Sequence, residues 1–163
     1  GTKVFASDLH EEQLKWAEGA GVTVVEPSRI LSTDADVLVP AALGGVLHDL
    51  SISKLRCQIV APVANNTLAH EDHAEQLHEK GVLYIPDFVM NSGALIEGAG
   101  YDAKKQLDWS DELRHIGETT TQVLDLSRRN QITTLQAAQE MAEDLLAKEF
   151  AESQTKSSEK LSS

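Results

Sequence analysis

Three deficits in the sequence restrict the classes of protein to which it can belong. The 163 residues include a single cysteine, Cys57, which forms no internal disulfide and is expected to be a small buried hydrophobe in a reducing, cytoplasmic compartment. Basic residues are scarce, and the net charge of -12 disfavours nucleic acid and anionic membrane surfaces as partners. No apolar run is long enough to span a bilayer, and no secretory signal opens the chain.

An initiator methionine is also missing. The chain begins at Gly1 and at once enters the strand-like run KVFASD, so we expect it to be a fragment of a larger protein. A hydrophobic content of 41% is enough for the core of one domain without metal or disulfides. Residues 151–163 are polar and serine-rich, and we expect this tail to be disordered because it has little apolar surface to offset the entropy of ordering.

Short apolar runs before Asp87 predict the strands of a parallel sheet, buried on both faces. The runs are KVFASD, VTVV, DVLVPAA, QIVAPVA and VLYIPD. Three intervals between them predict helices, at residues 10–20, 47–55 and 68–80. The third helix keeps Ala74 and Leu77 on one face and ends at Gly81, which tolerates a left-handed cap. Alternating strands and helices imply βαβ units, which bind ligands at the carboxyl ends of their strands.

After Asp87 the apolar spacing is helical. From Trp109 onward, residues such as Leu113, Ile116 and Val123 form an amphipathic stripe, which fits either a core or a subunit interface. A second long helix is predicted to open at Thr133, which has capping-box spacing to Gln136. Both helices are expected to pack on the sheet. The predicted fold class is therefore α/β: an incomplete Rossmann-type parallel sheet, flanked by helices and ending in two long helices.

The strand ends carry the residues best suited to bind a dinucleotide. Asp8 ends the first strand, where a carboxylate can accept hydrogen bonds from the adenosine ribose of NAD and oppose the 2′-phosphate of NADP. An acid in this position is also a common turn or helix-capping residue. Later strands end in PAALGG, APVANN and PDFVMNSGALIEG. Their small residues admit a flat ring, and their amides can pair with a carboxamide, although Gly, Pro and Asn are also turn formers.

Taken together, four motifs closely resemble the cofactor domain of the leucine, phenylalanine, valine and tryptophan dehydrogenases. They are PAALGG, ANN followed by Leu68, GVLYIPDFVMNSGALI and VVEPSRI, and the resemblance covers about residues 3–150. These enzymes reversibly deaminate an L-amino acid to its 2-oxo acid, with hydride passing to NAD. The resemblance implies a C-terminal NAD-binding domain, nearest to the leucine dehydrogenase-like branch, in a parent that acts on an L-amino acid as its small-molecule substrate and forms homo-oligomers.

The same resemblance implies roles for particular residues. Asp8 would bind the adenosine ribose, and Asn65 or Asn66 would contact the nicotinamide carboxamide. Asn91 would lie beside the nicotinamide and the substrate. The cofactor crevice would be lined by Ala41, Ala42 and Leu43, and the substrate pocket by Leu95 and Gly98.

Departures from the family pattern limit what these residues can do alone. The strand that opens the family's Rossmann domain, and the GxGxxG turn after it, would precede Gly1. The substrate domain with the family's catalytic lysine and aspartate would precede Gly1 as well. Residues 1–150 are thus expected to be a partial domain without catalytic residues, inactive and weak in NAD binding by itself. Ser92 and Ala94 replace Ala and Gly of the family's Asn-Ala-Gly-Gly. Gly98 replaces a branched residue, which suggests a bulky or aromatic substrate. The alternative is a non-catalytic Rossmann remnant or interaction module.

One histidine cluster has the spacing of metal ligands. His70 and His73 are three residues apart, and Asp72 and His78 lie nearby. Because three glutamates are interspersed with them, the pattern favours a solvated helix face, and no metal is expected.

Overall fold

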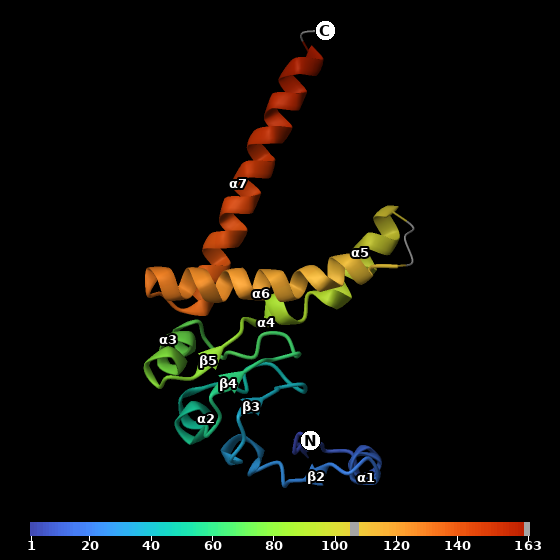
Figure 1. The fold of residues 1–163 in the computed structure, drawn as a ribbon, viewed down its shortest axis with the longest axis vertical. Coiled ribbons are helices and arrows are strands. Elements are labelled where there is room, and N and C mark those ends of the chain that lie inside the picture. The colour runs from blue at the N-terminus through green and yellow to red at the C-terminus, as the bar shows by residue number, and fades with distance from the viewer. Residues whose placement is uncertain (105–107, 162–163) are drawn as a thin grey trace.

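The structure is a computed structural model that describes residues 1–104 and 108–161, except the side chains of 99–104 and 152–161. Figure 1 shows three groups of elements: a small N-terminal unit, a parallel sheet with two helices, and a set of helices above that sheet. The last helix, α7, projects away from the rest (Figure 1). The predicted α/β class, with parallel strands flanked by helices, is confirmed.

The N-terminal unit is a single βαβ motif. Its elements are β1 (Phe5–Ala6), α1 (Glu11–Gly19) and β2 (Thr23–Val24), and the two strands pair in parallel with Phe5 opposite Thr23. Two glutamates in the first turn of α1 stabilise the helix, because their negative charges lie at the positive end of the helix dipole. Ala17 is the residue of α1 that is buried. The chain then turns through Gly21, whose φ of 82° suits glycine.

The second unit contains three parallel strands in the order β3-β4-β5. The strands are β3 (Val37–Leu38), β4 (Ile59–Val60) and β5 (Leu83–Tyr84). They are connected by α2 (Asp49–Lys54) and α3 (Asp72–Glu79). A 3-10 helix, η1 (Ile30–Ser32), precedes β3. Ala74 and Leu77 of α3 are buried, and Gly81 has a φ of 76°, so the predicted helix face and its glycine cap are confirmed.

The five strands form two separate ladders rather than one sheet, with β1 and β2 in one and β3, β4 and β5 in the other. The prediction that every strand is buried on both faces is wrong for β1, β2 and β3, none of which contains a buried residue. Val4 is 49% exposed, and Val37 and Val39 are 47% and 51% exposed. The physical reason is that the buried members of the main core lie on β4, β5, the two connecting helices and their adjoining loops, so the side chains of the other strands are covered by fewer neighbours.

The main core lies between the three-stranded sheet and its two helices. Leu47, Val60 and Leu77 are fully buried at its centre, and the remaining buried members are Ile52, Leu55, Cys57, Val82 and Tyr84. Cys57 is a free, buried thiol, as the apolar run around it predicted. This core fixes β4 and β5, and therefore fixes the loops that leave their carboxyl ends.

Four helices follow the sheet: α4 (Asp87–Met90), α5 (Gly93–Lys104), α6 (Ser110–Asn130) and α7 (Thr134–Leu161). No strand follows β5 in the described residues, as predicted. A second core, formed by Val89, Val123, Ala137 and Ala138, joins α4, α6 and α7. The start of α7 packs on the sheet, where the Thr134 hydroxyl donates to the carbonyl of Tyr84. In contrast to the prediction, α6 packs mainly on α4 and α7.

The structure bears on three expectations for these helices. The Thr133 hydroxyl accepts the backbone N–H of Gln136 at 3.1 Å, which is half of the predicted capping box. The Gln136 side chain instead donates to Glu140. Trp109 is buried, which favours the core interpretation of the α6 stripe at its first residue. The helix α7 continues to Leu161, into the segment predicted to be disordered; the division at residue 151 stays a prediction.

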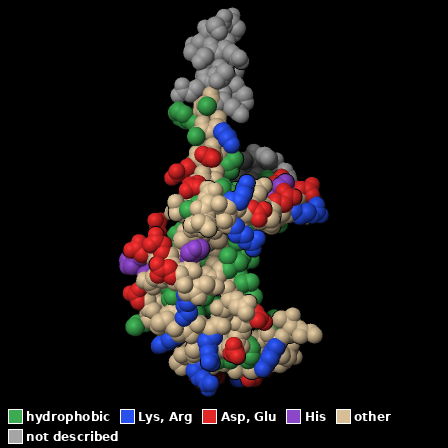
Figure 2. All heavy atoms as spheres, turned by 60° about the vertical axis from the view of Figure 1, so that its left-hand side comes forward, with side chains coloured by type: hydrophobic (Ala, Val, Ile, Leu, Met, Phe, Trp, Pro, Cys, Tyr) green, Lys and Arg blue, Asp and Glu red, His purple; other side chains and the backbone are tan. Residues whose placement is uncertain are grey.

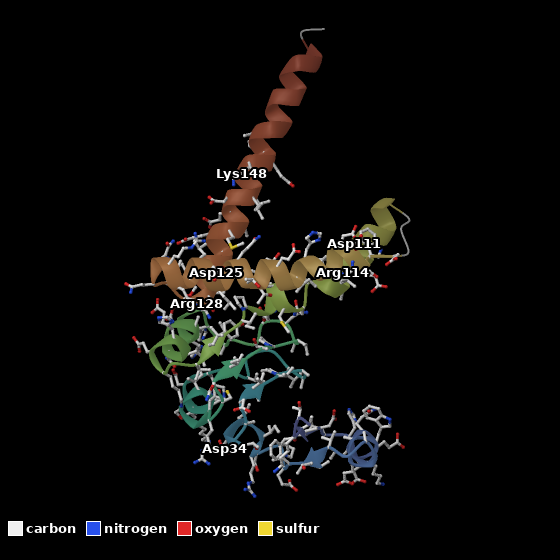
Figure 3. The ribbon with its side chains drawn as sticks, viewed as in Figure 1. Asp34, Asp111, Arg114, Asp125, Arg128 and Lys148 are labelled. Atoms are coloured by element: carbon white, nitrogen blue, oxygen red, sulfur yellow. The ribbon has the colours of Figure 1, made fainter. Side chains whose placement is uncertain are left out.

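The exposed face of α6 carries ion pairs along its length. In Figure 3, Asp111 and Arg114 lie near one end of α6, and Asp125 and Arg128 lie toward the other. Both pairs are three residues apart and well exposed, so each contributes little to stability. No helix in the described residues is long and apolar enough to cross a membrane.

Candidate functional site

The loops that follow β3 and β4 are in direct backbone contact. The N–H of Gly45 donates to the carbonyl of Asn66 at 2.7 Å, and Leu47 donates to the carbonyl of Thr67 at 2.9 Å. Gly44 lies so close that a Cβ added to it would stand 2.9 Å from the Asn66 oxygen and 3.1 Å from the Asn65 oxygen. The structure therefore brings together two of the predicted strand ends, PAALGG and APVANN.

A side-chain hydrogen bond joins the third strand end to the second. Asn91, the C-terminal cap of α4, donates from its Nδ2 to Oδ1 of Asn65 at 2.5 Å. Since α4 follows directly after β5, this bond links residues that leave neighbouring parallel strands. Asn66 takes a different role, because its φ of 52° is left-handed and its carbonyl is held by Gly45. Of the two predicted asparagines, Asn65 is the one whose side chain meets Asn91.

Thr67, which sequence reasoning did not select, holds the Asn65–Asn66 turn in place. Its backbone N–H donates to Oδ2 of Asp87 at 3.0 Å, and its hydroxyl lies 3.2 Å from the hydroxyl of Tyr84. Burial of Tyr84 raises the pKa of its phenol, so the hydroxyl stays protonated and can take part in this contact. The only sequence signal was for its partner Asp87, the acid that ends the run VLYIPD as Asp8 ends KVFASD.

Asp8 belongs to the other ladder, in the loop between β1 and α1. Its Oδ1 accepts the backbone N–H of His10 at 2.9 Å, and the residue is exposed. The structure thus shows Asp8 in the turn role that the sequence left open. Its second carboxylate oxygen retains acceptor capacity, and the ribose contact stays a prediction.

The remaining predicted site residues are exposed. Ala41, Ala42 and Leu43 follow β3, and Leu43 is 71% exposed. Leu95 is 73% exposed on α5, and a Cβ built on Gly98 would meet no atom within 4 Å. Figure 2 shows the molecule hollowed on its right side, between α6 and the N-terminal unit, with hydrophobic side chains on the inner wall. The roles of the predicted site residues as cofactor or substrate contacts stay predictions.

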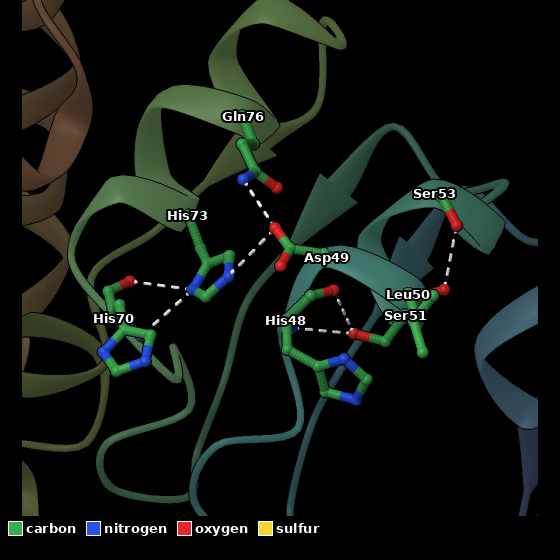
Figure 4. A network of polar contacts seen from close by, with 8 residues as sticks. All are labelled: His48, Asp49, Leu50, Ser51, Ser53, His70, His73 and Gln76. Carbon is green, nitrogen blue, oxygen red and sulfur yellow. Dashed lines mark hydrogen bonds and ion pairs between the residues drawn. The ribbon is translucent and has the colours of Figure 1, made fainter.

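The histidine cluster ties two helices together. His73 is 4% exposed, so the prediction that it lies on a solvated face is wrong. Its Nδ1 accepts the backbone N–H of His70 at 3.0 Å, and its Nε2 lies 3.5 Å from Oδ1 of Asp49, which also accepts from Gln76 at 2.8 Å (Figure 4). Asp49 is on α2, far from α3 in sequence. The described residues contain no group of three side chains arranged to hold a metal ion.

A cavity of about 330 Å³ lies elsewhere, between α3, β5 and the turn that joins α6 to α7. Its polar lining includes His78, Arg128 and Gln131. None of the predicted cofactor or substrate residues lines it, so it is separate from the strand-end site.

The fold is thus an α/β arrangement of parallel strands whose carboxyl ends carry small and amide side chains, the edge at which such folds bind ligands. The chain belongs to the glutamate/leucine/phenylalanine/valine dehydrogenase family, whose sequence profile matches residues 5–152. The resemblance inferred from the motifs is confirmed at this level.

Individual relatives agree with the family match. The chain is 39% identical over 151 residues to an L-tryptophan dehydrogenase of Nostoc punctiforme, covering 89% of this chain and 42% of that protein. It is 34% identical over 152 residues to a leucine dehydrogenase of Bacillus cereus, covering 90% and 41%. The crystal structure of the Nostoc punctiforme enzyme superposes with a TM-score of 0.80 at 35% identity, covering 87% and 43%. The chain therefore spans about two fifths of the length of these relatives.

Proposed function

We propose that residues 1–150 are the C-terminal, NAD-binding part of an NAD-dependent L-amino-acid dehydrogenase that deaminates its substrate reversibly to a 2-oxo acid. The observation that carries the proposal is the Asn65–Asn91 hydrogen bond, which brings two amides together where two parallel strands end. The family match and the named relatives support the reaction class. They do not favour the alternative of a non-catalytic module.

The division of the strands into two ladders fits this proposal. In a Rossmann sheet the strand order is 3-2-1-4-5-6. If β1 and β2 are the second and third strands, and β3, β4 and β5 are the last three, then the first strand belongs between β1 and β3. Val4, which precedes β1, and Val37 of β3 are both exposed. We infer that a preceding segment of the parent supplies this strand and the glycine-rich turn after it.

The amide pair has the chemistry to recognise nicotinamide. The bond between them uses one hydrogen of Asn91 and one lone pair of Asn65. The Asn65 nitrogen can still donate and the Asn91 oxygen can still accept, which is the complement of a primary carboxamide. NAD, when bound, supplies the hydride acceptor; the role of these side chains is to orient its ring.

The other contacts follow from position along the same edge. Residues 41–43 are exposed, and each is small or apolar. The next residue, Gly44, lies against the Asn65–Asn66 turn, so residues 41–43 are suited to form a wall of the cofactor crevice. The carboxylate of Asp8 would bind the adenosine ribose and would repel a 2′-phosphate, so NAD is proposed over NADP.

Leu95 and Gly98 on α5 are proposed to line the pocket for the substrate side chain. The open space around Gly98 supports a bulky or aromatic L-amino acid. A cytoplasmic homo-oligomer is proposed for the parent, and the exposed apolar residues of α7 would be available for subunit contacts: Leu145, Leu146 and Phe150.

The proposal is tested in the full-length parent with a panel of L-amino acids and with NAD and NADP. Asn65→Ala and Asn91→Ala should each raise the KM for NAD about tenfold, the loss expected for one or two hydrogen bonds to the ligand. Asn130→Ala, at the exposed end of α6, is the matched control and should leave the KM unchanged. A parent without NAD-dependent activity on any L-amino acid would refute the function.

The substrate pocket has its own test. Gly98→Val fills the open space on α5 and should shift the preference of the parent from phenylalanine or tryptophan toward leucine. An unchanged ratio of kcat/KM between leucine and phenylalanine would refute the proposal that Gly98 lines the substrate pocket.

A further inference from the structure

The polar groups of Thr67 are all engaged in hydrogen bonds with other segments. Its carbonyl accepts from Leu47, its hydroxyl meets Tyr84, and its N–H donates to Asp87. Thr67 is fully buried, so a bond lost here would leave a polar group without water. The residue is therefore a fixed point for the exposed Asn65–Asn66 turn that precedes it.

Asp87 satisfies two backbone donors at once. Oδ2 accepts the N–H of Thr67 at 3.0 Å, and Oδ1 accepts the N–H of Phe88 at 2.9 Å. An asparagine in this position has one oxygen and one NH₂ group, so it can accept from one of these donors and must point its own hydrogens at the other. The site requires a carboxylate rather than any polar side chain of that size.

Asp87 also stands at the junction of the two halves of the amide pair. It is the first residue of α4, whose C-terminal cap is Asn91, and through Thr67 it holds the turn that presents Asn65. A rotation of either segment would separate the Asn65 oxygen from the Asn91 nitrogen, which are 2.5 Å apart.

Resting on the proposed NAD site, we propose that Asp87 is a positioning residue: acting through the backbone N–H of Thr67, it fixes the orientation in which Asn65 and Asn91 together meet the nicotinamide carboxamide. Asp87 itself makes no contact with the cofactor in this role. Its removal affects recognition of the nicotinamide end and leaves recognition of the adenosine end intact.

The experiment compares Asp87→Asn and Asp87→Ser with the unmodified full-length parent, using two ligands, NAD and ADP-ribose. ADP-ribose lacks the nicotinamide ring, so it reports the adenosine and pyrophosphate contacts alone. Serine retains an oxygen suited to the start of a helix but is too short to reach Thr67. Asp125→Asn, an exposed carboxylate on α6 (Figure 3), is the control.

We expect Asp87→Ser, which leaves the buried N–H of Thr67 without its charged partner, to bind NAD about tenfold more weakly, with ADP-ribose affinity unchanged. Asp87→Asn, whose one oxygen can still accept from Thr67 but not from both donors, should lie between Asp87→Ser and the unmodified parent. Hydrogen exchange followed by mass spectrometry should show faster exchange in the peptide that contains Thr67. An equal loss for both ligands, or unfolding of both variants, would show a general structural role and overturn the proposal. Unchanged protection of the Thr67 amide would also overturn it, whether or not the parent binds NAD. Failure of the unmodified parent to bind NAD would count against the proposed function instead.

Discussion

The close approach of Gly44 to the Asn65–Asn66 turn gives a quantitative test of the strand-end site. A Cβ at residue 44 would stand 2.9 Å from the Asn66 carbonyl oxygen, about 0.5 Å inside the 3.4 Å at which ordinary contact begins. The obstacle is backbone rather than the end of a flexible side chain, so Gly44→Ala must push the two loops apart. Overpacking of this kind costs about 1–3 kcal/mol of stability.

Gly45→Ala is the matched comparison, one residue along the chain. Gly45 has a φ of 69°, and no atom lies within 4 Å of its built Cβ. The alanine would be strained in the left-handed region by about 1–2 kcal/mol, but it would displace nothing. The two substitutions therefore cost similar free energies of unfolding for different reasons, and only one of them moves Asn65.

The decisive assay is NAD binding by the two variants of the parent, with urea unfolding to check that their stabilities are comparable. A shift of about 0.5 Å in the Asn65 loop should weaken NAD binding roughly tenfold in Gly44→Ala, because positioning errors of this size are costly at a preorganised site. Gly45→Ala should bind as the unmodified parent does. Equal affinities in the two variants would refute the inference that the turn after β4 is part of the cofactor site.

Three further predictions concern the fold. The hydrogen bond from Gln76, aided by His73, lowers the pKa of Asp49. The stabilisation of the folded state by this bond is present above the ordinary aspartate pKa and is lost as the pH falls through the lowered pKa. Gln76→Ala should therefore raise the pKa of Asp49 measured by NMR, and an unchanged pKa would contradict the role of this bond. Burial raises the pKa of the Cys57 thiol, so labelling by an aromatic disulfide should be slow in buffer and fast in urea; rapid labelling of the folded chain would contradict its burial. Leu77→Ala, at a fully buried site, should cost about 2–5 kcal/mol in urea unfolding, against less than about 0.5 kcal/mol for Leu50→Ala, which is 70% exposed; equal losses would refute the assigned core.

Local patterns carried most of the information about the elements. The spacing of Ala74 and Leu77, followed by Gly81, predicted the face and the end of α3, since both depend on residues within one helical turn. The start of that helix was predicted four residues early. Leu68 pairs instead with Leu47 in an isolated bridge, and the N–H of His70 is taken by the His73 ring, so the chain bends through residues 69–71 and α3 begins at Asp72.

Contacts between distant segments were the part that sequence reasoning missed. Thr67 and Asp87 are 20 residues apart, and Asp49 and Gln76 are 27 apart. Periodicity shows which side of a helix is apolar, but His73 is a polar residue whose burial depends on an acid supplied by another helix. The motif resemblance implied that Asn65 or Asn66 shares a site with Asn91, while the choice of Asn65 and its direct hydrogen bond to Asn91 required coordinates.

The separation of the strands into two ladders has a consequence for cooperativity. Backbone pairing transmits stability from strand to strand, and this transmission is interrupted between β1 and β3. We therefore expect the first 25 residues to open as a unit of lower stability while the core around Leu77 remains protected from hydrogen exchange. The strand proposed to lie between the two ladders would join them into one cooperative unit, so the sharpness of the unfolding transition should report whether that strand is present.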